Sequence, residues 1–247
     1  MYYKISHYKM QNINLTKLQK FKDTLSPKNK EIVDIVVKNT VYITTAELVE
    51  MVKISLIKFI NKHPKYNLYM PTDKIGSEHY LMIKLEDLLN PIYVINDKLT
   101  KNTKLPNDYP ILIIDDAIYS SVNMCSYADN LRYNNVENEI YCVVGILSSQ
   151  TVQVVEDFNV NIIAHHILED KIICNLFEDY NFEYFYKYFD CESHYVLPIF
   201  FEHKIANEFG SYIFYHNICE KPINRTPIDS ISLQDIDEFI KRLECKL

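Results

Sequence analysis

The sequence predicts an α/β protein whose core is a parallel sheet covered by helices, and two observations support this. The first is the apolar run at residues 111–114, Ile-Leu-Ile-Ile, which follows Pro110 and is too short for an independent helix. A strand that is hydrophobic on both faces is typical of a parallel sheet with helices on both sides. The second is the alternation of short apolar runs with amphipathic segments between residues 66 and 168, which is the pattern of βα units.

Composition and charge exclude two classes of partner. The chain has 247 residues, 48% of them hydrophobic, and a net charge of -7. Nucleic-acid binding needs clustered Lys and Arg to neutralise phosphates, and no such cluster occurs. No apolar run approaches the ~18 residues of a membrane span, and residues 1–6 lack the apolar core of a signal peptide. We therefore expect a soluble, cytoplasmic protein that binds neither nucleic acid nor membrane.

The cysteines predict neither a metal centre nor a disulfide framework. There are 6 of them, spread along the chain with no C-x-x-C pair. Closely spaced pairs are the usual sign of a zinc site, and a disulfide framework is typical of short secreted chains. We expect reduced and mostly buried thiols.

Residues 1–63 predict an N-terminal helical lobe. Ser26-Pro27 is an N-cap followed by proline at the first helical position, and it opens a helix over 28–38. The sequence Thr-Thr-Ala-Glu at 44–47 is a capping-box pattern ahead of a second helix with one apolar face. Pro64 ends that helix.

Residues 64–170 predict the α/β core. We expect its main strands at 66–70, 111–115, 140–147 and 161–168, with a further strand within 91–96. The helices expected between them are 78–89, 122–133 and 150–158. The first strand is followed by a short loop with Lys and Gly and then by a helix capped by Ser77. This layout is suited to an anion, because free backbone amides and the helix dipole both favour negative charge.

Residues 171–247 predict a C-terminal cap rich in aromatic side chains. Tyr and Phe are frequent from 177 to 215, and residues 232–246 form an amphipathic pattern that predicts a final helix. Exposed aromatic side chains mark surfaces that bind partners. A homodimer is one assembly that such a surface would support.

The site is expected where the 111–115 strand ends. Asp115 and Asp116 follow the apolar run directly, and a polar turn, Tyr119-Ser120-Ser121, comes next. In open parallel sheets, ligands bind beyond the carboxyl ends of the strands. Adjacent carboxylates are costly unless they have partners, which makes this pair a candidate site; otherwise one of the two only caps the turn.

This stretch resembles the phosphoribosyl-pyrophosphate (PRPP) loop of type I phosphoribosyltransferases, in which an apolar strand, an acidic pair and a hydroxyl-rich turn open a helix. The resemblance implies a phosphoribosyltransferase-like sheet, PRPP or a nucleotide as ligand, Mg²⁺ as cofactor, and transfer of phosphoribosyl to or from a nucleobase. The acidic pair would hold the ribose hydroxyls and the metal. The other implied contacts are Tyr119 before the turn, Ser120, Ser121, Val122 and Asn123 at the phosphate, and Lys74, Ile75, Gly76 and Ser77 at the pyrophosphate.

The turn departs from the family pattern at three positions. Ser121 stands where the family has a glycine, and Asn123 where it has a threonine. Tyr119 stands where members acting on purines often carry a carboxylate base, and a phenol with a pKa near ~10 is a poor base at neutral pH. A glycine position of this kind predicts positive φ, which costs a serine on the order of 1 kcal/mol.

Two other hypotheses remain open at this point. The fold could serve as a non-catalytic scaffold or ligand sensor that acts through protein interactions. Residues 111–116 also resemble the first strand of a two-component receiver domain. In that case, counting elements places His165 or His166 where a receiver needs its phospho-accepting aspartate.

Overall fold

A computed structural model describes residues 14–71, 75–96, 105–119, 121–134, 136–168, 199–202 and 229–246. The described residues fall into two compact units. The smaller unit comprises those up to Thr45 together with 199–202. The larger unit comprises those of Ala46–Leu168 together with 229–246.

The smaller unit contains two helices whose starts follow from their capping residues. Helix α1 (Leu15–Asp23) begins after Asn14, whose side chain accepts a hydrogen bond from a first-turn amide. Helix α2 (Pro27–Asn39) begins with proline after Ser26, whose hydroxyl accepts from the Asn29 amide. The start predicted for α2 from the Ser-Pro pair is therefore confirmed.

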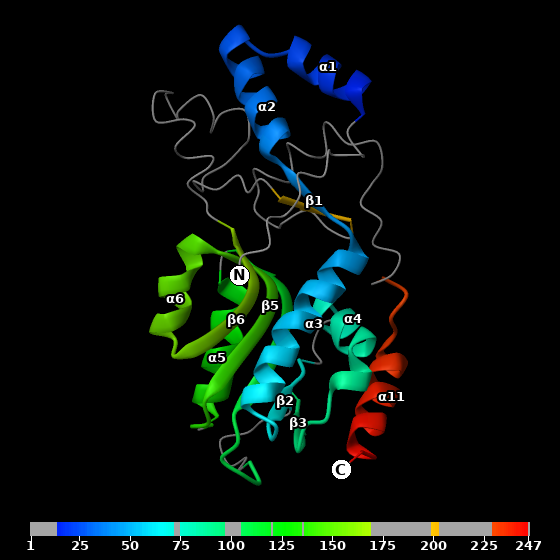
Figure 1. Ribbon diagram of the computed structural model, residues 1–247, viewed down its shortest axis with the longest axis vertical. Helices are drawn as coiled ribbons and strands as arrows, with labels where there is room; N and C mark the ends of the chain where they lie inside the picture. The colour runs from blue at the N-terminus through cyan, green and yellow to red at the C-terminus, as the bar shows by residue number, and fades with distance from the viewer. Residues whose placement is uncertain are drawn as a thin grey trace. The chain divides into compact units, whose positions relative to one another are not determined.

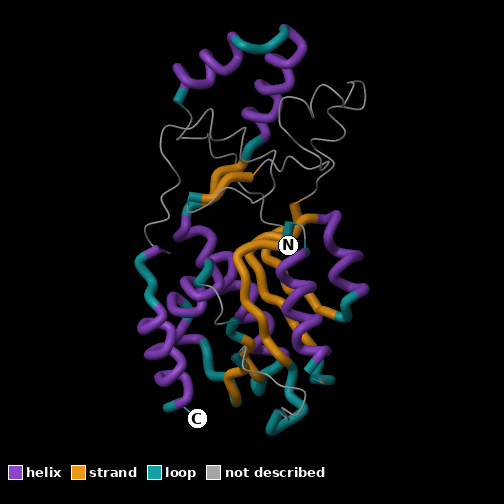
Figure 2. The backbone as a smooth tube through the Cα atoms, turned by 180° about the vertical axis from the view of Figure 1, so that it is seen from behind, coloured by secondary structure: helices purple, strands orange, loops and turns teal. Residues whose placement is uncertain are grey.

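Two short strands from distant parts of the chain complete this unit. β1 (Val41–Ile43) pairs in parallel with β7 (Ile199–Phe201), and Figure 2 shows the two side by side. Just after β7, the Glu202 amide donates to the carbonyl of Ile43, and the Glu202 carboxylate accepts from the amide of Thr45 at 2.8 Å. One side chain therefore joins segments more than 150 positions apart.

The larger unit is built on a five-stranded sheet in the order β3-β2-β4-β5-β6, with every neighbouring pair parallel (Figure 1). The α/β class with a parallel sheet is confirmed, and the arrangement is consistent with a phosphoribosyltransferase-like sheet. Two strands of this sheet, β2 and β3, precede β4 in the chain, so the acidic run is not the first strand of a receiver domain. The strands are β2 (Asn67–Tyr69), β3 (Tyr93–Ile95), β4 (Ile111–Ile118), β5 (Ile140–Ser148) and β6 (Val160–Leu168).

Helices cover both faces of this sheet (Figure 1). α5 and α6 lie on one face, whereas α3 and α4 lie on the other. α4 therefore follows β2 on one side of the sheet, and α5 follows β4 on the opposite side. The elements are α3 (Thr45–Lys62), α4 (Ser77–Lys84), α5 (Val122–Tyr133), α6 (Val152–Asp157) and α11 (Leu233–Glu244), with 3-10 turns η1 (Glu86–Leu88) and η2 (Ser149–Thr151).

Some boundaries differ from those predicted. α4 ends at Lys84 and gives way to η1, whereas a continuous helix to about Leu89 was expected. α6 begins two residues later than predicted, after a 3-10 turn. β4 continues to Ile118, because its last residues still pair with β5.

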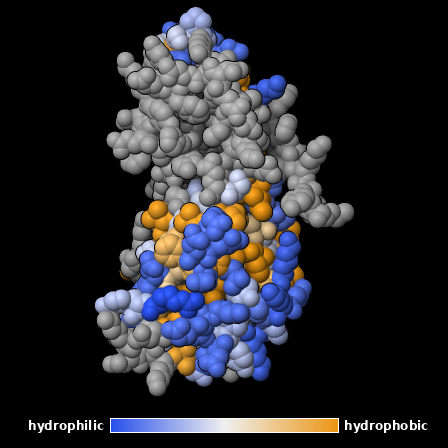
Figure 3. All heavy atoms as spheres, turned by 90° about the vertical axis from the view of Figure 1, so that its left-hand side faces the viewer, coloured by the Kyte–Doolittle hydropathy of each residue, from blue (hydrophilic) through white to orange (hydrophobic). Residues whose placement is uncertain are grey.

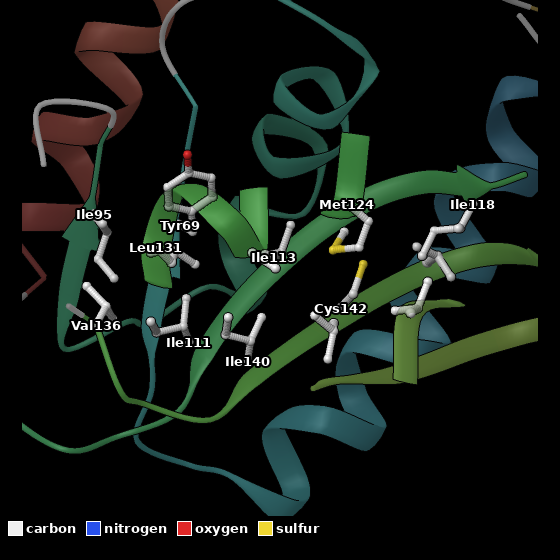
Figure 4. Close-up of a cluster of buried hydrophobic side chains, with 14 of the residues drawn as sticks. Tyr69, Ile95, Ile111, Ile113, Ile118, Met124, Leu131, Val136, Ile140 and Cys142 are labelled. Carbon is white, nitrogen blue, oxygen red and sulfur yellow. The ribbon is translucent and has the colours of Figure 1, made fainter. Parts of the chain in front are cut away.

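One cluster of buried hydrophobic side chains lies between the sheet and α5 (Figure 4). Strand residues of β4 and β5, such as Ile113 and Cys142, meet Met124 and Leu131 of α5, and all four are buried. Each buried aliphatic side chain of this size contributes about 1.5–3 kcal/mol relative to an exposed one. The apolar run that predicted β4 is therefore also a main source of stability for the unit.

The opposite face of the sheet packs closely against α3. A Cβ placed on Gly145 of β5 would lie 2.8 Å from Leu48 and 3.4 Å from Val52, both of which are buried on α3. α3 is thus part of the sheet unit, whereas the sequence assigned residues up to 63 to a separate lobe. The division into a lobe at 1–63, a core at 64–170 and a cap at 171–247 otherwise stays a prediction.

Helix α11 packs against the edge of the sheet. It begins after Ser232 with a capping box to Asp235 and buries Ile236, Phe239 and Leu243. The Arg242 guanidinium makes two hydrogen bonds, of 2.8 and 2.9 Å, to the carboxylate of Glu86. The amphipathic helix predicted at 232–246 is therefore present, although the aromatic segment at 177–189 lies outside the described residues.

The other edge of the sheet is formed by β6. Every residue of β5 is buried, whereas most of β6 is partly or fully exposed. Figure 3 views this side of the molecule, where hydrophobic residues reach the surface; Val154 and Ile167 are 42% and 41% exposed. None of the helices in the described part of the chain combines the length and hydrophobicity that crossing a membrane requires.

Candidate functional site

The strand order creates a switch point between β2 and β4. From β2 the chain moves outward to β3, and it then returns past β2 to build β4, β5 and β6 on the other side. The helices that follow β2 and β4 lie on opposite faces, so the loops after these two strands diverge, and a crevice is expected between them. Open α/β sheets bind ligands at this position. The two loops that the resemblance assigned to pyrophosphate and to ribose phosphate are the two that flank it.

The acidic pair lies inside β4, whereas the sequence placed it at the end of the strand. β4 pairs with β2 only through Ile111 and Leu112, but with β5 as far as Ile118. Extending the β2 register places Asp115 level with Pro71, just past the end of β2. On the β5 side, the pair therefore lies within the hydrogen-bonded part of β4. On the β2 side, it lies beyond the last paired residue.

The two carboxylates have different environments. Adjacent residues of a strand point to opposite faces, so Asp115 points to the α5 side and Asp116 to the α3 side. Asp115 is partly exposed, and its carboxylate accepts a hydrogen bond from the Asp116 amide at 2.8 Å. Asp116 is 0% exposed. A ligand arriving from solvent can thus reach Asp115 more easily than Asp116.

Tyr119, which follows the strand, stays protonated. Burial raises the pKa of its phenol well above the ordinary value, and the nearby charges of Asp116 and Asp115 raise it further. A protonated phenol donates a hydrogen bond and does not act as a base near neutral pH. Cys142 behaves in the same way, because burial and the charge of Asp115 raise the pKa of its thiol.

The turn after β4 has the backbone conformation that its family resemblance predicted. Ser121 has φ 61° and ψ −7°, in the left-handed region, and is the N-cap of α5. The expected positive φ is therefore confirmed at a residue with a Cβ. The Ser121 side chain makes no capping hydrogen bond to the helix.

The start of α5 carries no acidic residue, and its N-cap Ser121 is buried. Val122 and Asn123 both have exposed side chains, and the first turn of α5 contains neither Asp nor Glu. Free amides and a helix dipole without a competing carboxylate are favourable to an anion. Ser120 lies outside the described residues.

The described part of the loop after β2 leads into α4. Ile75 and Gly76 lead into α4, whose N-cap is Gly76 rather than the predicted Ser77. The Glu78 carboxylate lies over Gly76 at the start of this helix. Lys74, which the sequence assigned to pyrophosphate, lies outside the described residues. The described members of the two predicted loops, at 75–77 and within 115–123, thus follow the two strands that flank the switch point.

One residue that contacts this loop was not predicted from the sequence. His79 is buried on α4, and its ring hydrogen-bonds to backbone atoms of Pro71 and Gly76. The signal available in the sequence was its place three residues after a helix N-cap, where side chains often reach back to the backbone.

No preformed metal centre is present among the described residues, since no group of three or more His, Cys, Asp or Glu gathers there. The cysteines at 125, 142 and 245 are free thiols. A Mg²⁺ ion usually needs only one or two carboxylates, because substrate oxygens and water supply the rest. Asp115 fits this role, and fully buried Asp116 fits it less well.

Comparisons with known proteins identify similarity at the level of the fold only. No protein-family model matches the sequence, and no curated protein matches it. A hypothetical protein from Neisseria gonorrhoeae with bound ppGpp has 13% identity and a TM-score of 0.37, and the match covers 53% of this chain and 84% of that one. A purine phosphoribosyltransferase from Pyrococcus horikoshii Ot3 has 16% identity and a TM-score of 0.32, with 51% and 87% covered. At these scores the similarity identifies no ligand, so evidence for one has to come from the residues of this chain.

Proposed function

We propose that the chain binds a phosphorylated ribose ligand, either PRPP or a nucleotide, in the crevice between β2 and β4. The observation that carries the proposal is the switch point. It supports the proposal because the turn at Ser121 follows β4 and the loop before α4 follows β2, the two neighbouring strands at that point. In an active protein the reaction would be transfer of the phosphoribosyl group to or from a nucleobase.

Each part of such a ligand has a chemical counterpart at the site. Backbone amides at the start of α5, from Ser121 to Asn123, suit the 5′-phosphate. The Asp115 carboxylate can accept hydrogen bonds from ribose hydroxyls, and these charge-assisted bonds are stronger than neutral ones. The amides of Ile75 and Ser77 would contact the pyrophosphate, together with Lys74, whereas the Gly76 amide donates to His79. Tyr119 would act as a hydrogen-bond donor.

Mg²⁺ is part of this proposal because the ligand carries several negative charges. Asp115 would hold the ion, with Asp116 as the second carboxylate if the strand adjusts. A bound Mg²⁺ neutralises charge on phosphate oxygens and orients the leaving group.

Calorimetry with PRPP and Mg²⁺ tests the proposal directly. Asp115→Asn should weaken binding by about 10- to 150-fold, the equivalent of losing one charge-assisted interaction of about 1.5–3 kcal/mol. Asp129→Asn on the exposed surface of α5 is the matched control and should bind like the parent. Absence of heat at millimolar PRPP with the parent protein would contradict the proposal.

The second candidate function is a ligand sensor or scaffold without catalysis, and two observations favour it. Asp116 is fully buried, and Tyr119 cannot serve as a base near neutral pH. The burial of Asp116 and the protonation of Tyr119 both limit catalysis more than they limit ligand binding. Incubation of the protein with PRPP, Mg²⁺ and a panel of nucleobases separates the two functions, because only a transferase releases pyrophosphate. Binding without release would support the sensor, and steady release would exclude it.

A further inference from the structure

The outer edge of β6 is long and carries no fixed charge. β6 pairs with β5 on one side, and none of the other described strands lies on its outer side. Its 9 residues include no Lys, Arg, Asp, Glu or Pro. Edge strands of monomeric proteins are usually short or carry such residues, because an open row of backbone N–H and C=O groups otherwise pairs with another strand. The β6 edge therefore has the properties of a pairing surface.

The two edges of the sheet differ in this respect. At the opposite edge β3 has only 3 residues, and α11 packs beside it. At the β6 edge, apolar side chains reach solvent from the strand and from α6, which contacts it: Ile167 is 41% exposed and Val154 42%. Apolar surface thus lies next to the open backbone of β6.

The two histidines of β6 add no charge near neutral pH. Burial lowers the pKa of both His165 and His166. Neutral imidazole rings do not repel each other, whereas like charges directly opposite each other destabilise a strand pair. Two copies of β6 can therefore lie side by side without electrostatic repulsion between them.

Helix α3 carries opposite charges at its two ends beside this edge. Glu47 and Glu50 lie in its first half, and Lys58 and Lys62 in its second. After burial, the charges that act on the pKa of His165 are those of Lys58, which lowers it, and Glu50, which raises it. Glu50 and Lys58 therefore lie on either side of the middle of β6, about two helical turns apart.

A second copy of the chain added antiparallel to β6 suits both the backbone and these charges. A two-fold axis perpendicular to the sheet relates such a pair, so the two α3 helices lie on the same face and run in opposite directions. Glu50 of each copy then lies toward Lys58 of the other. On the other face, the acidic end of α6, Glu156-Asp157, lies toward the uncharged start of the second α6.

We propose that the chain forms a two-fold symmetric homodimer in which the β6 strands of two copies pair antiparallel and join the two sheets into one, with Glu50 of each copy opposite Lys58 of the other. Such an interface is closed, because each copy uses its β6 edge once and no further copy can add there. It does not depend on any ligand.

The first experiment is sedimentation equilibrium of the full chain over a range of concentrations, which should give twice the mass of one chain. Ile167→Lys places a charge on the pairing edge of both copies and should weaken dimerisation at least about tenfold. Ile92→Lys is the matched control, since it makes the same change at a residue that is 37% exposed near the opposite edge. This control should dimerise like the parent.

The second experiment exchanges the charges on α3. Glu50→Lys and Lys58→Glu should each weaken dimerisation about threefold to tenfold, because each places like charges opposite each other at two symmetric positions. The double variant should restore it. Within one chain Glu50 also forms an ion pair with Lys53 at 3.2 Å. Glu50→Lys with Lys53→Glu is therefore the control: it keeps that internal pair and should not restore dimerisation.

Three results would overturn the proposal. The first is a parent protein that stays monomeric at millimolar concentration and low salt. The second is a dimer that Ile167→Lys and Ile92→Lys affect equally, which would place the interface elsewhere. The third is a double variant of Glu50 and Lys58 that is no better than the single variants, which would exclude the antiparallel arrangement. Circular dichroism of each variant shows that the comparison is made on folded protein.

Discussion

At the scale of single residues, the most informative position is Ser121, because it combines a strained backbone with a place in the crevice. Its φ of 61° is one of two positive values at non-glycine residues in the described part of the chain, the other being 54° at Asn159. Asparagine tolerates this conformation better than serine does. The positive φ at Ser121 is therefore less well tolerated than the one at Asn159.

Ser121→Gly should raise the free energy of unfolding by about 0.5–1 kcal/mol, because relief of the positive φ outweighs the greater freedom of glycine in the unfolded chain. Urea unfolding measures the change. Ser126→Gly is the matched control: it lies on the exposed side of the same helix and should instead lower stability by about 0.5 kcal/mol. If the turn binds phosphate, Ser121→Gly should also tighten binding, because a Cβ is removed where the backbone meets the ligand.

At the scale of elements, the close approach of α3 to β5 depends on the absence of a side chain at Gly145. The backbone there is not in the left-handed region, so the glycine serves packing rather than conformation. A Cβ would meet Leu48 from the helix, and the carbonyl of Asp116 from β4 at 3.1 Å. The same glycine thus allows α3 to pack directly behind the acidic pair.

Gly145→Ala should destabilise the protein by about 1–3 kcal/mol through overpacking. Gly76→Ala is the control, because a Cβ there meets only the flexible carboxylate of Glu78, and it should cost less than about 1 kcal/mol. Chemical denaturation of the two variants provides the comparison. In a Leu48→Ala background the cost of Gly145→Ala should shrink, and equal costs in both backgrounds would show that α3 is not the obstacle.

The contact between α11 and η1 predicts a pH-dependent contribution to stability. The hydrogen bond from Arg242 holds the pKa of Glu86 below its ordinary value. A carboxyl group with a lowered pKa in the folded state stabilises the protein above its unfolded pKa, and this stabilisation is lost as the pH falls through the folded pKa. Arg242→Ala should therefore lower the melting temperature slightly at pH 7. The difference from the parent should disappear in acid.

Lys241→Ala, one position earlier on an exposed part of α11, is the control for that experiment and should show no such pH dependence. A difference between parent and Arg242→Ala that persists unchanged in acid would mean that Arg242 acts through packing of its alkyl chain. Because the pair is largely exposed, added salt should also reduce the effect.

At the scale of the whole molecule, the sheet unit is assembled from separated parts of the chain. Ala46–Leu168 supplies the sheet, and the C-terminal segment returns to add α11 beside β3. The last residues of the chain therefore complete a unit that begins near residue 46. A truncation near residue 170 would remove α11 along with the aromatic segment, so it cannot isolate the effect of the latter.

Ending the chain after residue 228 should lower the free energy of unfolding by at least about 3 kcal/mol, since the truncation removes three buried side chains, Ile236, Phe239 and Leu243. Thermal unfolding measures the loss. A synthetic peptide of residues 229–247 should restore stability when added in excess, and the same peptide with Phe239→Ala should not. Unchanged stability of the truncated chain would show that α11 is dispensable for the sheet.

The sequence by itself determined the class of the fold and most of its elements. Local patterns predicted them because each depends on neighbours in the chain: the apolar run of β4, the Ser-Pro start of α2, and the capped amphipathic helix α11. The positive φ at Ser121 was predicted through the family resemblance, because the family has a glycine at this position. The switch point was implied only through the family resemblance.

Tertiary structure decided what depends on residues far apart in the chain. The order of the strands made β2 and β4 neighbours at the switch point, and pairing with β5 extended β4 past the acidic pair, in which Asp116 is buried and Asp115 is partly exposed. The roles of His79 and Gly145 likewise depend on their contacts, which are the backbone of Pro71 and Gly76 for His79 and the α3 side chains for Gly145. Register and burial are set by contacts between strands and helices, and no single segment of sequence contains that information.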